Sequence, residues 1–119
     1  MPRIMLIDDE PGVIFALKLM LEALECEVLP FSQGKLALET LKTDQRFDFI
    51  LCDLRMPELD GFDVLTAVKS LNSNIPFILI SGHATAEDIE RGKALGISSF
   101  LGKPFSAQDL KEILSKILI

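Results

Sequence analysis

Apolar residues occur along the chain both as short continuous runs and as longer stretches with a helical period. The runs predict five strands, over Arg3–Ile7, Glu27–Pro30, Phe47–Cys52, Phe77–Ile80 and Ile97–Leu101. Several of them are apolar at consecutive residues, as the strands of a parallel sheet are when both of its faces are covered. Strands that alternate with helical stretches are typical of βαβ units. We therefore expect an α/β fold with a five-stranded parallel sheet.

The longer stretches predict five helices, of which the first and the last have the clearest apolar stripes. These stripes are Val13, Ile14, Leu17, Met20, Leu21 and Leu24, and Leu110, Ile113, Leu114, Ile117 and Leu118. Their spacing of three and four residues is that of an amphipathic helix. Two further apolar sets mark the second and third helices, at Leu36, Leu38 and Leu41, and at Phe62, Val64, Leu65, Val68 and Leu71. Asp60-Gly61 introduces the third helix as a turn or cap.

The fourth predicted helix, over Ala84–Leu95, has the weakest pattern. Charged residues dominate it, and Gly92 within it costs about 1 kcal/mol relative to alanine. A poorly anchored helix is a candidate moving part.

The composition favours one folded domain over residues 1–119. Hydrophobic residues make up 49% and charged residues 25% of the chain, with a formal net charge of -6. This negative charge argues against direct binding to nucleic acid or to an anionic membrane surface. No apolar run approaches the roughly 20 residues that span a bilayer, and the N-terminus lacks the pattern of a signal peptide. Cys26 and Cys52 have no metal-ligand spacing, so we expect reduced, buried thiols and a cytoplasmic protein.

Polar residues whose side chains can react or bind a metal ion follow four of the five predicted strands. Asp8 and Asp9 come after the first strand, Asp53 after the third, Ser81 after the fourth and Lys103 after the fifth. The carboxyl ends of parallel strands share one edge of the sheet, where ligands bind in α/β folds. We therefore expect three carboxylates, a hydroxyl and an ammonium group in one shallow site.

Such a group of carboxylates requires compensating positive charge. Lys103 supplies part of it, and an all-oxygen ligand set fits Mg²⁺, which binds one or two carboxylates and completes its shell with water and phosphate. An aspartate can act as the nucleophile that forms an aspartyl phosphate. Phosphoryl transfer needs mainly positioning and neutralisation of the phosphoryl oxygens.

Three segments resemble the signature segments of response-regulator receiver domains: Leu6-Ile7-Asp8-Asp9-Glu10, Asp53 to Gly61, and Lys103-Pro104-Phe105. The resemblance covers essentially the whole chain. It implies a flavodoxin-like (βα)5 three-layer sandwich with strand order 2-1-3-4-5. It also implies a function in the phosphorelays of two-component regulatory systems, in which the chain accepts a phosphoryl group and changes conformation to regulate an output partner or domain.

By this resemblance Asp53 is the phosphoacceptor, and Mg²⁺ is bound by Asp9, Asp53 and the backbone carbonyl of Arg55, with help from Asp8 through water. Lys103 contacts the phosphoryl group. Ser81 is the switch hydroxyl that draws the loop after the fourth strand inward, and Phe100 is the aromatic residue that turns in behind it.

Two positions depart from the family pattern: Phe100 lacks the hydroxyl of a tyrosine, and Arg55 places a bulky cation beside the site, so the lifetime of the phosphoryl group does not follow from the resemblance. A cis peptide bond is expected at Lys103-Pro104.

The implied partners are a sensor histidine kinase or phosphotransfer protein, and an output domain or partner. Because weakly anchored elements move most easily, we expect the output contact at the surface formed by the fourth helix, fifth strand and fifth helix. A homodimer on phosphorylation is also compatible with the family. The domain is not expected to turn over an external substrate. The rival interpretation is a receiver fold that serves as a dimerisation or docking module without phosphorylation.

Simpler interpretations exist for each residue taken alone. Asp8 or Asp9 could cap the first helix, Asp53 could be a turn residue, Lys103 a solvated charge, Ser81 a loop hydroxyl and Phe100 a core residue. Their convergence at one sheet edge favours the joint interpretation over these.

Three other functions are weaker alternatives. A thiol nucleophile would pair Cys52 with the base His83. Adjacent residues of a strand point to opposite faces, however, so if Asp53 reaches the site, Cys52 should face away from it. An FMN-binding module would need phosphate donors where Asp8-Asp9-Glu10 lies. An aspartyl phosphatase typically has a second acid where this chain has Arg55.

Overall fold

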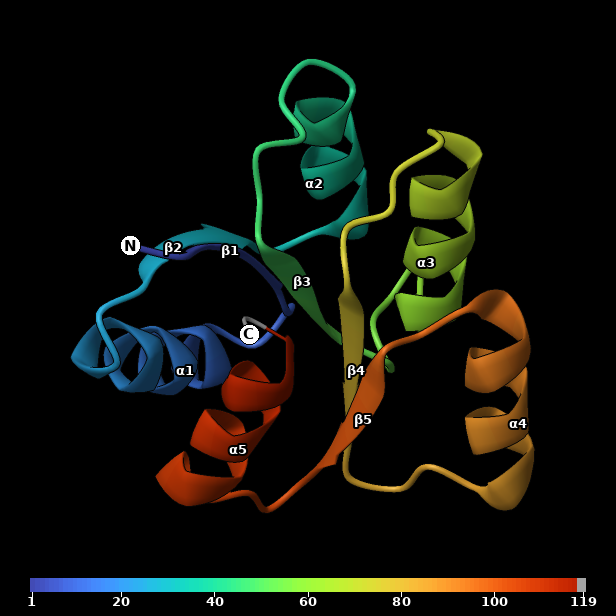
Figure 1. The fold of residues 1–119 in the computed structure, drawn as a ribbon. Helices are drawn as coiled ribbons and strands as arrows, with labels where there is room; N and C mark the ends of the chain where they lie inside the picture. Colours follow the sequence, from blue (N-terminus) through green and yellow to red (C-terminus); the bar gives the residue numbers. More distant parts are fainter. Residues whose placement is uncertain (118–119) are drawn as a thin grey trace.

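The computed structural model describes residues 1–117 as five strands that alternate with five helices (Figure 1). The strands are β1 Arg3–Ile7, β2 Glu27–Phe31, β3 Phe49–Asp53, β4 Phe77–Ser81 and β5 Ser99–Gly102. The helices are α1 Pro11–Ala23, α2 Gly34–Leu41, α3 Gly61–Ser70, α4 Ala86–Leu95 and α5 Ala107–Ile117. Leu118, which belongs to the predicted stripe of the last helix, lies outside the described residues.

The strands form one parallel sheet in the order β2-β1-β3-β4-β5, which confirms the predicted topology. Helices α1 and α5 lie on one face of the sheet, and α2, α3 and α4 lie on the other (Figure 1). The chain therefore has the three layers of a flavodoxin-like fold. Strand β3 lies at the centre of the sheet, and all five of its residues are buried.

Two apolar cores fill the space between the sheet and its helix layers, because successive strand residues point to opposite faces. In β3, Phe49 and Leu51 belong to the core below α1 and α5, whereas Ile50 and Cys52 belong to the core below α2 and α3. This alternation fixes which face each residue takes. Cys52 accordingly faces a helix layer, as its position in the strand predicts.

Two predicted strands begin later than the hydrophobic pattern suggests. Phe47 is buried, but its N–H bonds to the carbonyl of Gln45 in a tight turn, and the guanidinium of Arg3 lies 4.4 Å from its ring centroid. The N–H of Ile97 bonds to the carbonyl of Gly92 and so helps to end α4. Phe47 and Ile97 therefore belong to the turns that precede β3 and β5, and not to the strands.

Helix α4 begins two residues later than predicted, because Thr85 is its N-cap. The Thr85 hydroxyl accepts from the N–H of Asp88, and the Asp88 carboxylate accepts from the N–H of Thr85. Asp60 and Asp63 form the same reciprocal capping box at the start of α3, where the sequence predicts a cap. Within residues 1–117, no helix has both the length and the apolar character needed to cross a membrane.

Candidate functional site

The residues predicted to form the site all lie at the carboxyl edge of the sheet. Asp8 and Asp9 directly follow β1, and Lys103 directly follows β5. Asp53 and Ser81 are the last residues of β3 and β4, because each of these strands extends one residue further than predicted. Because β1, β3, β4 and β5 are successive neighbours in the sheet, the fold gathers these five residues at one place.

Asp53 is almost completely buried at the end of β3, with 4% of its surface exposed. Its Oδ1 lies 3.6 Å from Nζ of Lys103. Burial raises the pKa of Asp53, the Lys103 charge opposes this rise, and the negative charge of Asp9 adds to it. Lys103 and Asp9 thus both lie within electrostatic reach of Asp53, as the predicted convergence requires.

Asp8 is fully buried, and this burial raises its pKa to about 6. The N–H of Glu10 donates to Asp8 Oδ1 at 2.9 Å, which opposes the rise, whereas the charge of Asp53 adds to it. The alternative in which Asp8 or Asp9 caps the first helix is wrong. The N-cap of α1 is Glu10, and no side chain caps it.

The acidic residues have oxygen atoms free to bind a cation. Oδ2 of Asp8 and Oδ1 of Asp9 are buried and have no hydrogen-bond partner within residues 1–117. Carboxylate oxygens of Asp8, Asp9 and Glu10 lie within 4.8 Å of one another. Glu10 was not among the predicted metal ligands. Unpaired, closely spaced oxygens fit a hard divalent ion such as Mg²⁺.

Hydrogen bonds join the loops after β4 and β5. The hydroxyl oxygen of Ser81 accepts from the N–H of His83 at 3.2 Å, and the carbonyl of Ser81 accepts from the N–H of Lys103 at 2.9 Å. The peptide bond Lys103-Pro104 is cis, as expected. Ser81 therefore links the two loops that carry the hydroxyl and the cation of the site.

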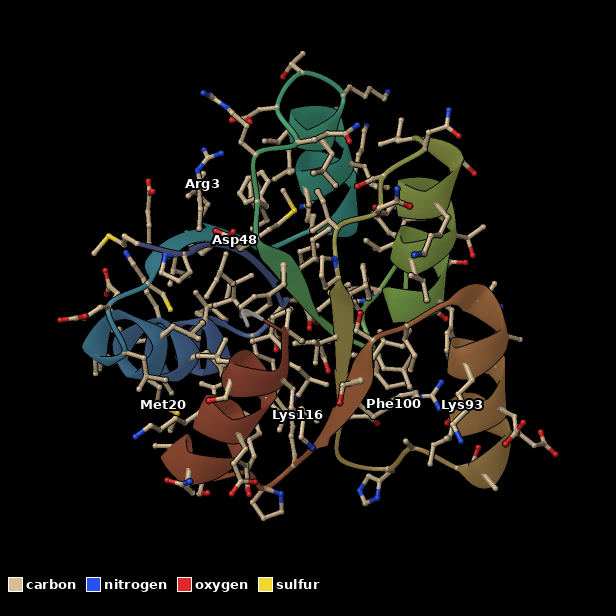
Figure 2. All side chains as sticks on the ribbon, viewed as in Figure 1. Arg3, Met20, Asp48, Lys93, Phe100 and Lys116 are labelled. Atoms are coloured by element: carbon tan, nitrogen blue, oxygen red, sulfur yellow. The ribbon has the colours of Figure 1, made fainter. Side chains whose placement is uncertain are left out.

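Phe100 lies in β5, is half-buried, and is found between this strand and α4 (Figure 2). It packs at the edge of the core below α2 and α3. A Cβ added to Gly92 of α4 would lie 2.9 Å from Cε2 of the Phe100 ring. The absence of a side chain at Gly92 therefore makes room for this ring.

Arg55 follows β3 by two residues, and its exposed side chain forms an ion pair that the sequence did not predict. Its Nη2 lies 2.8 Å from Oδ2 of Asp88 in the first turn of α4. The loop after Asp53 is thus connected to α4.

The alternative of a thiol nucleophile does not fit the structure. Cys52 is completely buried, and this burial raises the pKa of its thiol. His83 is exposed in the loop after β4. Cys52 and His83 form no hydrogen bond, and a buried neutral thiol is a poor nucleophile.

Two hollows flank the site on the surface. One, of about 300 Å³, adjoins Asp9 and is otherwise lined by Ser32, Gln33, Gly34, Lys35, Met56, Pro57, Glu58 and Leu59. The other, of about 320 Å³, adjoins Lys103 and is otherwise lined by Gly12, Val13, Ala16, Leu17, Met20, Pro104 and Phe105.

Comparison with known families identifies the chain. Residues 4–115 match the model of the response regulator receiver domain. The chain belongs to this family. It is therefore a receiver domain of two-component signalling systems, as the sequence resemblance implied.

Relatives and solved structures agree with this assignment. The chain is 32% identical over 92% of its length to the transcriptional regulatory protein PrrA of Mycobacterium tuberculosis, and 29% identical over 98% to the two-component response regulator ARR10 of Arabidopsis thaliana. It spans 46% and 21% of these relatives, respectively. A receiver domain protein from Clostridium thermocellum superposes with a TM-score of 0.93 at 28% identity, covering 99% of this chain and 94% of the other.

One similar structure contains a metal. The receiver domain of the sensor histidine kinase PA1611 from Pseudomonas aeruginosa has a magnesium ion in its active site cleft. It superposes with a TM-score of 0.88 at 28% identity, covering 98% of this chain and 97% of the other. Receiver domains thus occur both in response regulators and in sensor kinases.

Proposed function

We propose that Asp53 accepts a phosphoryl group from a histidine kinase or phosphotransfer protein, and that residues 1–119 form one domain that responds by changing conformation. The observation that carries the proposal is the ion pair of a buried carboxylate at the end of the central strand with Lys103. Burial and the neighbouring acids make this carboxylate costly to keep charged. A phosphoryl group on Asp53 would add further negative charge, which Lys103 is placed to neutralise.

In the transfer, an Asp53 carboxylate oxygen forms a bond to phosphorus as the P–N bond to the donor imidazole breaks. The leaving imidazole takes up a proton. Lys103 neutralises a phosphoryl oxygen, and the Ser81 hydroxyl, which can donate while it accepts from His83, bonds another. Each of these groups comes from a different strand end, so the transfer depends on the sheet register.

We further propose that Asp8, Asp9, Asp53 and the backbone carbonyl of Arg55 hold Mg²⁺. The unpaired oxygens of Asp8 and Asp9 support this assignment. The bound ion would neutralise charge that builds up on the phosphoryl group.

Ser81 and Phe100 are the proposed switch residues. A bond from the Ser81 hydroxyl to the phosphoryl group would draw the hydroxyl toward Asp53, and the loop after β4, which is bonded to the hydroxyl oxygen through the N–H of His83, would shift with it. This loop leads directly into α4, against which Phe100 packs. The surface of α4, β5 and α5 is therefore the proposed contact for an output domain, a partner or a second phosphorylated copy.

The domain acts as a signalling element and turns over no external substrate in this proposal. The position two residues after Asp53, where an aspartyl phosphatase has its general acid, is Arg55, whose side chain is paired with Asp88. The two cysteines are unpaired and buried, which suits the reducing conditions of the cytoplasm.

Incubation with acetyl phosphate and Mg²⁺, followed by intact mass spectrometry, tests the phosphoacceptor. The parent chain should gain one phosphoryl mass, and Asp53→Asn should gain none. Asp48→Asn is the matched control, because Asp48 is an exposed aspartate just before the opposite end of the same strand. It should be labelled like the parent. A parent chain that stays unlabelled would contradict the proposal and favour a docking module that works without phosphorylation.

A further inference from the structure

Helix α4 has little apolar anchorage. Gly92 is its only buried residue, although Ile89 and Leu95 are half-buried. The neighbouring helix α3, of equal length, buries five residues. Contacts other than apolar burial therefore contribute much of what holds α4 to the body of the domain.

Charged side chains make such contacts along α4. Arg55 pairs with Asp88 in its first turn, and the guanidinium of Arg91 lies 4.5 Å from the ring centroid of Phe62 in α3. At the other end, a Cβ added to Gly96 would lie 3.3 Å from Cε of Lys69. Cationic side chains thus connect α4 to the loop after β3 through Arg55 and to α3 through Arg91.

The contact of Arg55 differs from the others because it connects α4 to the loop that directly follows Asp53. Arg55 lies two residues after Asp53, and the N–H of Leu54 between them bonds to the carbonyl of Ile80 in β4. The start of this loop is therefore fixed to the sheet, and the Arg55 side chain extends from a backbone next to the site.

Asp88 has two functions at once. Its Oδ2 lies 2.8 Å from Nη2 of Arg55 and also accepts from the N–H of Thr85 at 3.0 Å. The capping contact does not need Arg55. Loss of the ion pair would therefore leave the helix capped but would release its first turn from the loop after β3.

We propose that the Arg55–Asp88 pair is an electrostatic latch on α4, and that a phosphoryl group on Asp53 releases it by competing with Asp88 for the Arg55 side chain. The competition rests on the proposed role of Asp53. The latch itself is a property of the unphosphorylated chain.

Charge favours the phosphoryl group in this competition. A phosphoryl group carries a charge of about −1.5 to −2 near neutral pH, against −1 for a carboxylate. Guanidinium groups bind phosphate oxygens with bidentate geometry. The Arg55 side chain is 61% exposed, so its present pair is partly screened and weak enough to exchange.

Hydrogen exchange of the α4 amides in the unphosphorylated chain tests the latch. Arg55→Gln removes the cation and keeps the backbone carbonyl, and Asp88→Asn keeps an oxygen that can accept from Thr85. Each variant should speed exchange in the first turn of α4 by about two- to fivefold, the range of an exposed ion pair. The double variant should add little, because both changes remove one contact.

Lys93→Gln is the matched control. Lys93 lies in the last turn of α4 and forms no ion pair within residues 1–117. Its loss removes the same charge without touching the latch, so the first turn should exchange as in the parent. Equal exchange in the parent and Arg55→Gln would overturn the latch.

The competition is tested by adding beryllofluoride with Mg²⁺, a mimic of the phosphoryl group. Exchange in the first turn of α4 should speed up more in the parent than in Arg55→Gln, because the variant has already lost the ion pair and only the shift of the loop after β4 remains. Equal acceleration in both chains would overturn the competition. Labelling by acetyl phosphate is followed separately by mass, so a chain that takes up no phosphoryl group would contradict the role of Asp53 and not the latch.

Discussion

The ammonium group of Lys103 faces the carboxylate of Asp53 at a distance of 3.6 Å across the carboxyl edge of the sheet. The two residues come from the turn after β5 and the end of β3, and β4 separates these strands. Backbone hydrogen bonds along β4 bring them together, since Leu54 bonds to Ile80 and Lys103 to Ser81. This relationship makes Lys103 the first side chain to test.

Lys103→Met should raise the pKa of Asp53 and slow its phosphorylation. The Lys103 charge lowers this pKa, so its removal leaves burial and Asp9 unopposed. Loss of a group that neutralises a reacting oxygen costs about 100-fold in rate. Carboxyl NMR titration and the initial rate of labelling by acetyl phosphate measure the two effects. Lys116→Met, in the last turn of α5, is the control and should change neither.

Asp8→Asn should stabilise the metal-free chain at pH 7.5 and have little effect near pH 4. The folded chain holds the Asp8 proton up to a pH of about 6, above the ordinary value of 3.8, so ionisation of Asp8 destabilises the fold as the pH rises between these values. With allowance for solvent screening, the gain at pH 7.5 is about 2 kcal/mol.

Urea unfolding in EDTA at both pH values measures this difference. Asparagine can still accept from the N–H of Glu10, so the local turn is kept. The control is Asp48→Asn, which changes an exposed aspartate away from Asp8, Asp9 and Asp53. An Asp8→Asn chain that is less stable than the parent at pH 7.5 would show that its carboxylate contributes favourably to the fold.

Mg²⁺ should stabilise the parent chain more at pH 7.5 than at pH 5. Protonated Asp8 is a poor ligand, and its pKa of about 6 lies between the two conditions. A metal that binds only the folded state adds about 1.4 kcal/mol at ten times its dissociation constant. Thermal unfolding with and without MgCl₂ measures the effect, which Asp9→Asn should reduce. A stabilisation independent of pH and of Asp9 would place the ion elsewhere.

Gly92→Ala should displace the Phe100 ring from α4. The new Cβ would lie 2.7 Å from Cδ1 of Ile97 and 2.9 Å from Cε2 of Phe100. Overpacking costs about 1–3 kcal/mol, against a gain of about 1 kcal/mol in helix propensity. Part of the net loss should be recovered in the double variant with Phe100→Leu, because the contact with Ile97 remains. Urea unfolding measures stability, and NMR contacts of the Phe100 ring report its position.

Much of the fold could be predicted from sequence, because buried parallel strands and amphipathic helices have distinct periods. The starts of two strands were predicted too early, because an apolar residue before each strand belongs to a turn. Phe47 packs below Arg3, and Ile97 ends α4 through a bond to Gly92. Neither contact involves a periodic pattern that a local window can detect.

The site could be located because its residues directly follow strands and the sheet determines where strand ends meet. Contacts between side chains of distant loops could not be predicted in this way. Arg55 and Asp88 are 33 residues apart, and both have simple local interpretations, as a loop cation and a capping residue. The raised pKa of Asp8 likewise depends on burial, which its position beside the exposed Glu10 does not reveal.

The central position of β3 affects how such a domain can evolve. Both of its edges are hydrogen-bonded and all its residues are buried, so the backbone that carries Asp53 has little room to move. We therefore expect a reaction at its end to displace the surrounding loops and to leave the strand in place. Substitutions in the two apolar cores can adjust folding stability, and substitutions in the loops can adjust timing and partner choice, largely independently of each other.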